Sequence, residues 1–116
     1  IPVLAPLTHD KHGNILNTNA DTIAGETAKA LAKIFDVELV YCFEKKGVLM
    51  DENDEDSVIP VLDKADFENL VEKKIIQGGM IPKLQNAFQS IETGVKKVII
   101  TEASQLGKNT GTVISV

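Results

Sequence analysis

Cysteine is almost absent from this sequence, which has Cys42 alone among its 116 residues. One thiol excludes an internal disulfide and any cysteine-rich zinc site. The sequence also lacks an apolar run near the roughly 18–20 residues that cross a bilayer, and no charged-then-apolar leader is visible at its start. These absences favour a reducing, cytoplasmic setting with no membrane partner. Ile1 is not an initiator methionine, so we expect the C-terminal piece of a longer protein.

Positive charge is also in deficit. The chain has 12 Lys and Arg against 17 Asp and Glu, for a net charge of -5 and a pI near 4.9. This balance disfavours nucleic acid as a partner, because its backbone attracts basic surfaces. The hydrophobic share of 43% and the charged share of 25% are typical of a soluble globular domain. We therefore expect a single domain over residues 1–116, with no linker or repeat.

Hydrophobic periodicity predicts alternating strands and helices. Apolar residues at 3–4-residue spacing predict helices over residues 22–35, 63–74 and 80–92. Short apolar runs predict strands over residues 1–7, 15–17, 38–43, 58–62, 95–100 and 112–116, with turns at 8–14 and 75–79. This alternation predicts an α/β fold, a layered sheet with helices on both faces.

The predicted core follows from the same patterns. In the first helix the stripe that we expect to be buried is Ile23, Thr27, Ala30, Leu31 and Ile34. The run at 38–43 reads as a buried strand, so Cys42 is expected to be a small core residue.

Two polar segments can each be interpreted either as an exposed turn or as a metal-binding site. Residues 51–57 hold five acidic side chains, which we interpret as a solvated hairpin tip; a calcium loop would need the glycine and distal glutamate of an EF-hand, and both are missing. His9 and His12 flank a turn, but no third metal ligand lies at a convincing spacing. We assign no metal site to the chain.

The first segment with chemical potential is Asn17-Thr18-Asn19-Ala20-Asp21, between a strand and a helix. A helix N-terminus offers free N–H groups to anions. One interpretation is structural: Asn19 caps the helix and Asp21 complements its dipole. In the functional interpretation, Asn17 donates hydrogen bonds to a ligand and Asp21 orients cationic groups around a phosphate.

The second segment is Gly78-Gly79-Met80-Ile81-Pro82-Lys83. The glycines permit close approach of the backbone to a ligand, and Pro82 suits the first turn of a helix. Lys83 falls in that turn, where a cation opposes the helix dipole at a cost of up to about 1 kcal/mol. A phosphate facing Lys83 would explain the placement; the alternative is a solvent-facing lysine.

The third segment is residues 43–49, which begins at the last residue of the predicted strand 38–43. Ligands in α/β sheets bind beyond the carboxyl ends of the strands. Gly47 could admit a nucleotide there, with Lys45 or Lys46 near phosphate or ribose. An ordinary strand-to-hairpin turn is the alternative.

With these three segments in order, the sequence resembles the C-terminal half of the acetylglutamate kinases, a branch of the amino acid kinase family. That family transfers the ATP γ-phosphoryl group to the side-chain carboxylate of an N-acylated glutamate, in arginine biosynthesis. The resemblance implies that Lys83 contacts the transferring group, Asp21 orients the lysines and Asn17 binds the amino-acid substrate. It also implies nucleotide-binding roles for Glu44, Lys45, Lys46, Gly47, Val48, Leu49, Ile75, Ile76 and Gln77.

The resemblance further implies Mg²⁺ between the phosphates, the N-terminal half of the same kinase as a partner, and a homo-oligomer. The sequence departs from the family at Glu44, where aspartate is usual, and residues 102–111 are short for the helix expected there. The Gly-rich phosphate loop of the N-terminal half is not in this chain, so we expect the 116 residues alone to lack appreciable kinase activity. Two alternatives are a domain that senses a nucleotide or effector without catalysis and a purely structural α/β domain; the presence of both Asp21 and Lys83 favours the enzyme.

Overall fold

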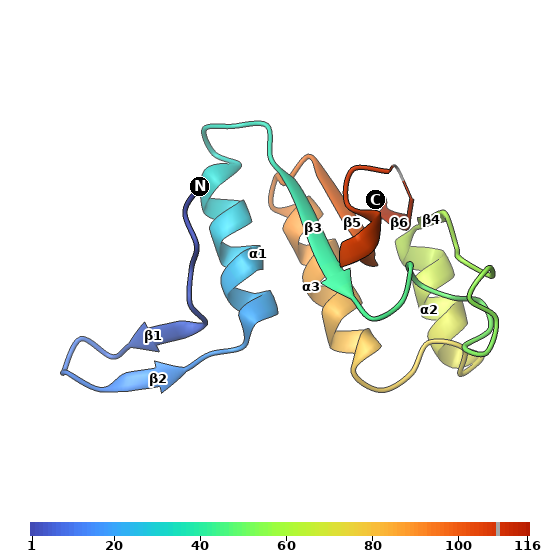
Figure 1. Ribbon diagram of the computed structural model, residues 1–116, viewed down its shortest axis with the longest axis horizontal. Coiled ribbons are helices and arrows are strands. Elements are labelled where there is room, and N and C mark those ends of the chain that lie inside the picture. The colour runs from blue at the N-terminus through green and yellow to red at the C-terminus, as the bar shows by residue number, and fades with distance from the viewer. Residues whose placement is uncertain (109) are drawn as a thin grey trace.

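The computed structural model describes residues 1–108 and 110–116, and Asn109 lies outside the described residues. Figure 1 shows their arrangement. The elements in chain order are β1 (Leu7–His9), β2 (Ile15–Asn17), α1 (Ala20–Leu31), β3 (Glu38–Phe43), β4 (Val61–Leu62), α2 (Lys64–Glu72), α3 (Met80–Glu92), β5 (Lys97–Glu102), the 3₁₀ helix η1 (Ala103–Gln105) and β6 (Thr112–Ile114). The α/β class predicted from the sequence is confirmed.

The main sheet places the ends of β3 and β5 side by side. It has four strands in the order β3-β5-β6-β4, and β1 and β2 form a separate hairpin. β3 and β5 are parallel, with Glu38 opposite Lys97 and Phe43 opposite Glu102. Both strands therefore end at the same edge of the sheet, which is where ligands bind in this class of fold.

The core lies between the sheet and its helices. α1 and α3 contact each other and both contact the sheet; in Figure 1, α3 passes behind β3 and α1 stands to its left. Tyr41 of β3 is buried against these helices. The contact leaves little space, because a Cβ added to Gly25 of α1 would lie 3.2 Å from the Tyr41 hydroxyl and 3.5 Å from the Ser90 Oγ of α3. α2 joins this core through Phe67, whose ring centroid is 5.4 Å from that of Phe88.

The layering differs in one respect from the sequence-based expectation of helices on both faces. Val40, Ile99 and Val113 lie opposite one another on β3, β5 and β6, on the face away from Tyr41. All three are only half-buried. The helices that contact the sheet in the described residues thus share one face, and aliphatic side chains remain partly exposed on the other.

β3 is not the buried strand that its apolar composition predicts. It is an edge strand of the sheet, and among its residues only Tyr41 is buried. Side chains alternate along a strand, so Tyr41 faces the helices and Cys42 faces away. The expectation that Cys42 is a core residue is therefore wrong, because its thiol lies on the less covered face and is exposed.

α1 is shorter than predicted and uses another face for packing. The helix ends at Leu31 rather than at residue 35, and its buried residues are Gly25 and Ala28. Leu31 and Ile34 remain 44% and 78% exposed, so the expectation that they belong to the core is wrong. Gly25 lies close to α3, because a Cβ added there would be 3.5 Å from the Ser90 Oγ, and hydrophobic periodicity does not detect a contact made by a glycine.

Some strands begin later than the sequence-based ranges predict. The first strand is Leu7–His9 rather than residues 1–7, because the hairpin register pairs Leu7 with Asn17 and His9 with Ile15. β5 begins at Lys97 rather than at residue 95. The helix before it stops near Gly94, whose φ of 106° suits glycine.

The acidic segment forms a surface turn. An isolated antiparallel bridge joins Leu49 to Val58, and residues 51–56 between them are exposed. Asp51 and Asp54 organise this turn through hydrogen bonds that their side chains accept from local backbone N–H groups. No helix among the described residues has the length and apolar character that a membrane crossing requires.

Candidate active site

Asp21 is placed by the cap of α1. The Asn19 side chain accepts hydrogen bonds from the backbone N–H groups of Asp21, at 2.8 Å, and Thr22, at 3.3 Å. The predicted cap at Asn19 is thus confirmed, and Asp21 lies in the first turn. There its carboxylate complements the positive end of the helix dipole.

Lys83 lies in the first turn of α3, and its side chain reaches the start of α1. Its Nζ is 3.6 Å from Asp21 Oδ2, and the two side chains are 36% and 24% exposed. The carboxylate offsets the unfavourable position of a cation at a helix N-terminus. Because a partly exposed ion pair contributes at most about 1 kcal/mol to stability, the pair does little for the fold. The ammonium group carries three N–H donors, so it can also bind a second anion.

A cavity of about 390 Å³ lies next to the start of α3. Its walls are the loop after β3 and the turn before α3. Its lining includes seven of the residues that the sequence predicts for nucleotide binding: Lys45, Gly47, Val48, Leu49, Ile75, Ile76 and Gln77. The remaining lining residues are Glu52, Gly78, Gly79 and Met80. Its volume lies in the range of about 300–1,000 Å³ that is typical of small-molecule sites.

Two predicted nucleotide-binding residues are not part of this cavity. Glu44 is exposed, and it does not line the cavity. The Nζ of Lys46 lies 3.3 Å from Asp56 Oδ1, and Lys46 lines a different cavity together with Gly111. Their placement gives no geometric support to a direct nucleotide contact.

Asn17 is also apart from the Lys83–Asp21 pair. It is the last residue of β2 and is exposed. In Figure 1 the β1–β2 hairpin projects away from β3 and α3. Among the described residues, no side-chain hydrogen bond joins Asn17 to Asp21 or to Lys83, and its substrate contact stays a prediction.

Phe43, to which the sequence motifs assign no role, lies under Lys83. The Lys83 Nζ is 3.9 Å from the centroid of the Phe43 ring. Strand alternation places Phe43 on the same face as Tyr41, at the carboxyl end of β3. This position was the available signal, because side chains at strand ends line the ligand-binding edge of an α/β sheet.

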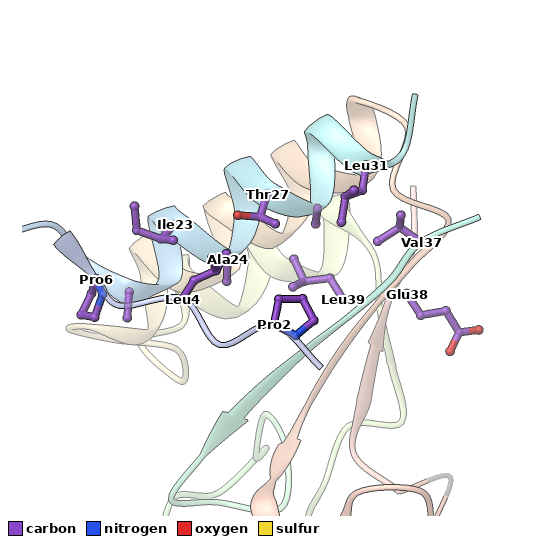
Figure 2. A pocket seen from close by; sticks show the side chains of 12 residues that line it. Pro2, Leu4, Pro6, Ile23, Ala24, Thr27, Leu31, Val37, Glu38 and Leu39 are labelled. Atoms are coloured by element: carbon purple, nitrogen blue, oxygen red, sulfur yellow. The ribbon is translucent and has the colours of Figure 1, made fainter. Parts of the chain in front are cut away.

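A second, apolar groove of about 370 Å³ lies on the other side of α1. Figure 2 shows that Pro2, Leu4 and Pro6 run along it, with Ile23 and Leu31 of α1 above and Leu39 of β3 below. The carboxylate of Glu38 points away from the groove in this view. The groove therefore lacks the charged groups that phosphoryl chemistry requires. Among the described residues, no group of three or more His, Cys, Asp or Glu side chains is arranged to hold a metal ion.

Thr112 fixes the loop that lines the nucleotide-sized cavity. Its buried Oγ1 accepts a hydrogen bond from the Val48 N–H at 2.8 Å and donates one to the Ile59 carbonyl oxygen at 2.7 Å. We expect Thr112→Val to lower the free energy of unfolding by about 2–4 kcal/mol, because the buried N–H of Val48 and the partly buried carbonyl of Ile59 lose their partner. Urea denaturation of the whole protein measures this change.

Thr101→Val is the matched control for Thr112→Val. The Oγ1 of Thr101 is buried and has no hydrogen-bond partner among the described residues. The same substitution should therefore be neutral or slightly stabilising. Equal losses of stability for the two variants would contradict the assigned role of Thr112.

The phenol of Tyr41 reports on the carboxylate of Asp21. Burial raises the pKa of Tyr41 above its ordinary value, and the nearby charge of Asp21 raises this pKa further, against a lowering by the Ser90 hydroxyl. We expect Asp21→Asn to lower the pKa of Tyr41 while leaving it above the ordinary value. Absorbance of tyrosinate against pH measures this shift, with Tyr41→Phe as the blank and Asp36→Asn as the control. An identical midpoint in Asp21→Asn would contradict the proximity of these two groups.

The fold, with Asp21 at the start of α1 paired to Lys83 at the start of α3, is that of one family of proteins. The model of the amino acid kinase family matches residues 1–102, and the chain belongs to that family. Its parallel β3 and β5 end at one edge of the sheet, and Lys83, which pairs with Asp21, lies over the ring of Phe43 at the end of β3.

Similar relatives share one particular name. An acetylglutamate kinase of Parabacteroides distasonis is 68% identical over 112 residues, which are 97% of this chain and 44% of the relative. An acetylglutamate kinase of Phocaeicola vulgatus is 67% identical over 114 residues, or 98% of this chain and 44% of the relative. Among solved structures, smu.665 of Streptococcus mutans UA159 matches with a TM-score of 0.78 at 34% identity, over 98% of this chain and 42% of that protein. The chain spans less than half the length of these proteins.

Proposed function

We propose that the whole protein transfers the γ-phosphoryl group of ATP to the side-chain carboxylate of N-acetyl-L-glutamate, and that this chain supplies the ATP-binding half. The observation that carries the proposal is the convergence of Lys83 and Asp21, from two different helix starts, to a distance of 3.6 Å. The cavity of about 390 Å³ at the start of α3 supports it. The names of the relatives supply the acceptor, because this chain itself does not define an acyl-glutamate site.

The chemistry needs alignment of two anions and neutralisation of the charge that they bring together. Lys83 would place its ammonium group against the transferring phosphoryl group. Asp21 would hold that ammonium group at the junction of α1 and α3 rather than take part in bond making. The N-terminus of α3 adds a positive dipole at the same place.

The cavity divides into parts that suit different regions of a nucleotide. Val48, Leu49 and Ile76 offer an apolar wall for a base. Gly78 and Gly79 lead into α3, so their backbone can approach phosphate oxygens closely. Mg²⁺ would arrive with the nucleotide and neutralise its phosphates; no step is assigned to a metal ligand of this chain.

The proposal also includes an amino-acid substrate, an N-terminal half of the kinase and further copies of the protein. Asn17 would contact the amino-acid substrate once an N-terminal half of the same kinase is docked, and the complete protein would be a cytoplasmic homo-oligomer. We also propose that residues 1–116 form one nucleotide-binding domain without appreciable kinase activity of its own.

Two measurements on the whole protein test the function. Trapping the acyl phosphate with hydroxylamine, together with ADP release, should show transfer that depends on N-acetyl-L-glutamate. Calorimetry with a Mg²⁺-bound, non-hydrolysable ATP analogue should show binding. Binding without transfer would instead support a nucleotide-sensing domain, and neither binding nor transfer would support a structural role. Substantial ADP release by the 116 residues alone would contradict the proposed inactivity of this half.

A further inference from the structure

The ammonium group of Lys83 is held between an anion and an aromatic face. Asp21 Oδ2 lies 3.6 Å from Nζ, and the ring centroid of Phe43 lies 3.9 Å from the same atom. The second distance is well within the roughly 6 Å at which a ring face attracts a cation. Two groups from different elements, α1 and β3, therefore fix the end of a side chain that starts on α3.

We propose that Phe43 is a positioning residue, whose ring holds the Lys83 ammonium group where the transferring phosphoryl group binds. The inference rests on the proposed function. Phe43 acts through Lys83, and no contact of the ring with ATP is required.

An aromatic face suits this task better than a second carboxylate. A lysine side chain has a flexible four-carbon stem, and a partly exposed ion pair restrains it weakly. A second carboxylate would restrain it more, but would also neutralise the charge needed by the phosphate. The ring attracts the cation through its quadrupole and carries no net charge. Lys83 is thus restrained while its positive charge stays available.

Phe43 is itself held by its neighbours. Its ring stacks on that of Tyr41, with centroids 6.2 Å apart and planes 7° apart. The Tyr41 hydroxyl donates a hydrogen bond to the backbone oxygen of Asp21 at 3.3 Å. Asp21, Lys83, Phe43 and Tyr41 therefore form a closed circuit of contacts, in which a shift of the Phe43 ring changes the position of Lys83 relative to Asp21.

The test compares Phe43→Leu with Phe43→Tyr in the whole protein. Leucine keeps an apolar side chain but removes the ring face, whereas tyrosine keeps the face. We expect Phe43→Leu to lower kcat by about 3- to 30-fold, as expected for loss of one cation–π contact, with the KM for ATP changed by less than about twofold. Phe43→Tyr should keep most of the wild-type kcat. In a Lys83→Met background, Phe43→Leu should have no further effect.

Two results would overturn the proposal. One is equal kcat in wild type and Phe43→Leu. The other is an undiminished effect of Phe43→Leu in the Lys83→Met background, which would indicate a structural role independent of the lysine. Thermal unfolding of each variant separates loss of fold from loss of positioning.

A readout that does not depend on activity separates this proposal from the proposed function. Protons above an aromatic face resonate upfield, so the ε-methylene protons of Lys83 should be shifted upfield in wild type and return to ordinary positions in Phe43→Leu. If the wild type transfers no phosphoryl group, the proposed function fails, and this NMR shift still decides the contact. Its absence in the wild type overturns the role of Phe43, and its presence supports it.

Discussion

Lys83→Ala in the whole protein should lower kcat for acyl phosphate formation by about 10²–10³-fold, which is the usual loss when one group that stabilises transition-state charge is removed. The reason is that Lys83 is the cation that α3 brings to Asp21. The cavity assigned to ATP lies at the start of the same helix, where Met80 lines it, although neither Lys83 nor Asp21 does. The charge of the transferring group would then lack its neutralising partner. Steady-state kinetics with ADP and hydroxamate detection measure this loss.

Stability should change little in the same variant. The ion pair with Asp21 is partly exposed, so its loss costs at most about 1 kcal/mol, and removal of a cation from a helix N-terminus is favourable. Lys96→Ala is a matched control, because Lys96 pairs with Asp36 at 2.8 Å on the surface, at the opposite end of the strands. Near-normal kcat in Lys83→Ala, or an equal loss in Lys96→Ala, would contradict the assignment.

Gly111→Ala should cause a large loss of stability, although it adds only one methyl group. A Cβ at Gly111 would lie 2.4 Å from the Ile100 carbonyl oxygen and 2.9 Å from Thr101 Cβ, and the φ of Gly111 is 107°. Backbone strain and steric overlap each cost about 1–3 kcal/mol. We expect the free energy of unfolding to fall by about 2–5 kcal/mol in denaturant titration.

Gly107→Ala isolates the steric part of this effect. Gly107 also has a positive φ, of 81°, but a Cβ there would have no neighbour within 4 Å. It should lose only the strain of the left-handed conformation, about 1–2 kcal/mol. If the two variants lose equal stability, the close approach of Gly111 to β5 is not what limits this position.

Periodicity predicted some elements with their observed bounds. The strand Glu38–Phe43 and the helix Met80–Glu92 match the sequence-based ranges, because each has local signals at its ends. Residues 80–92 follow two glycines and precede Gly94, and their apolar spacing places Leu84, Ala87 and Phe88 in the core. Local pattern and tertiary packing agree here.

Packing that depends on distant segments was not predictable in the same way. Leu31 and Ile34 look like core residues, yet the buried residues of α1 are Gly25 and Ala28. Cys42 lies in an apolar run, but whether it is covered depends on which face of the edge strand β3 the helices occupy. The register of the β1–β2 hairpin likewise fixes the first strand at Leu7–His9.

The candidate site was predictable in part. Sequence motifs indicated Asp21 and Lys83 and most of the residues lining the cavity at the start of α3. They assigned no role to Phe43, the first residue of the third segment, because its contact with Lys83 depends on the three-dimensional approach of α3 to β3. Lys46 looked suitable for a phosphate, but its ammonium group pairs with Asp56 in the acidic turn.

The central claim is that Lys83 and Asp21 act as one unit on a bound phosphoryl group. A double-mutant cycle with Lys83→Ala and Asp21→Ala, measured by kcat in the whole protein, tests it most directly. Groups that act as a unit are strongly non-additive, so the double variant should be about as slow as the slower single variant. Multiplied losses, with each substitution acting independently of the other, would contradict the account.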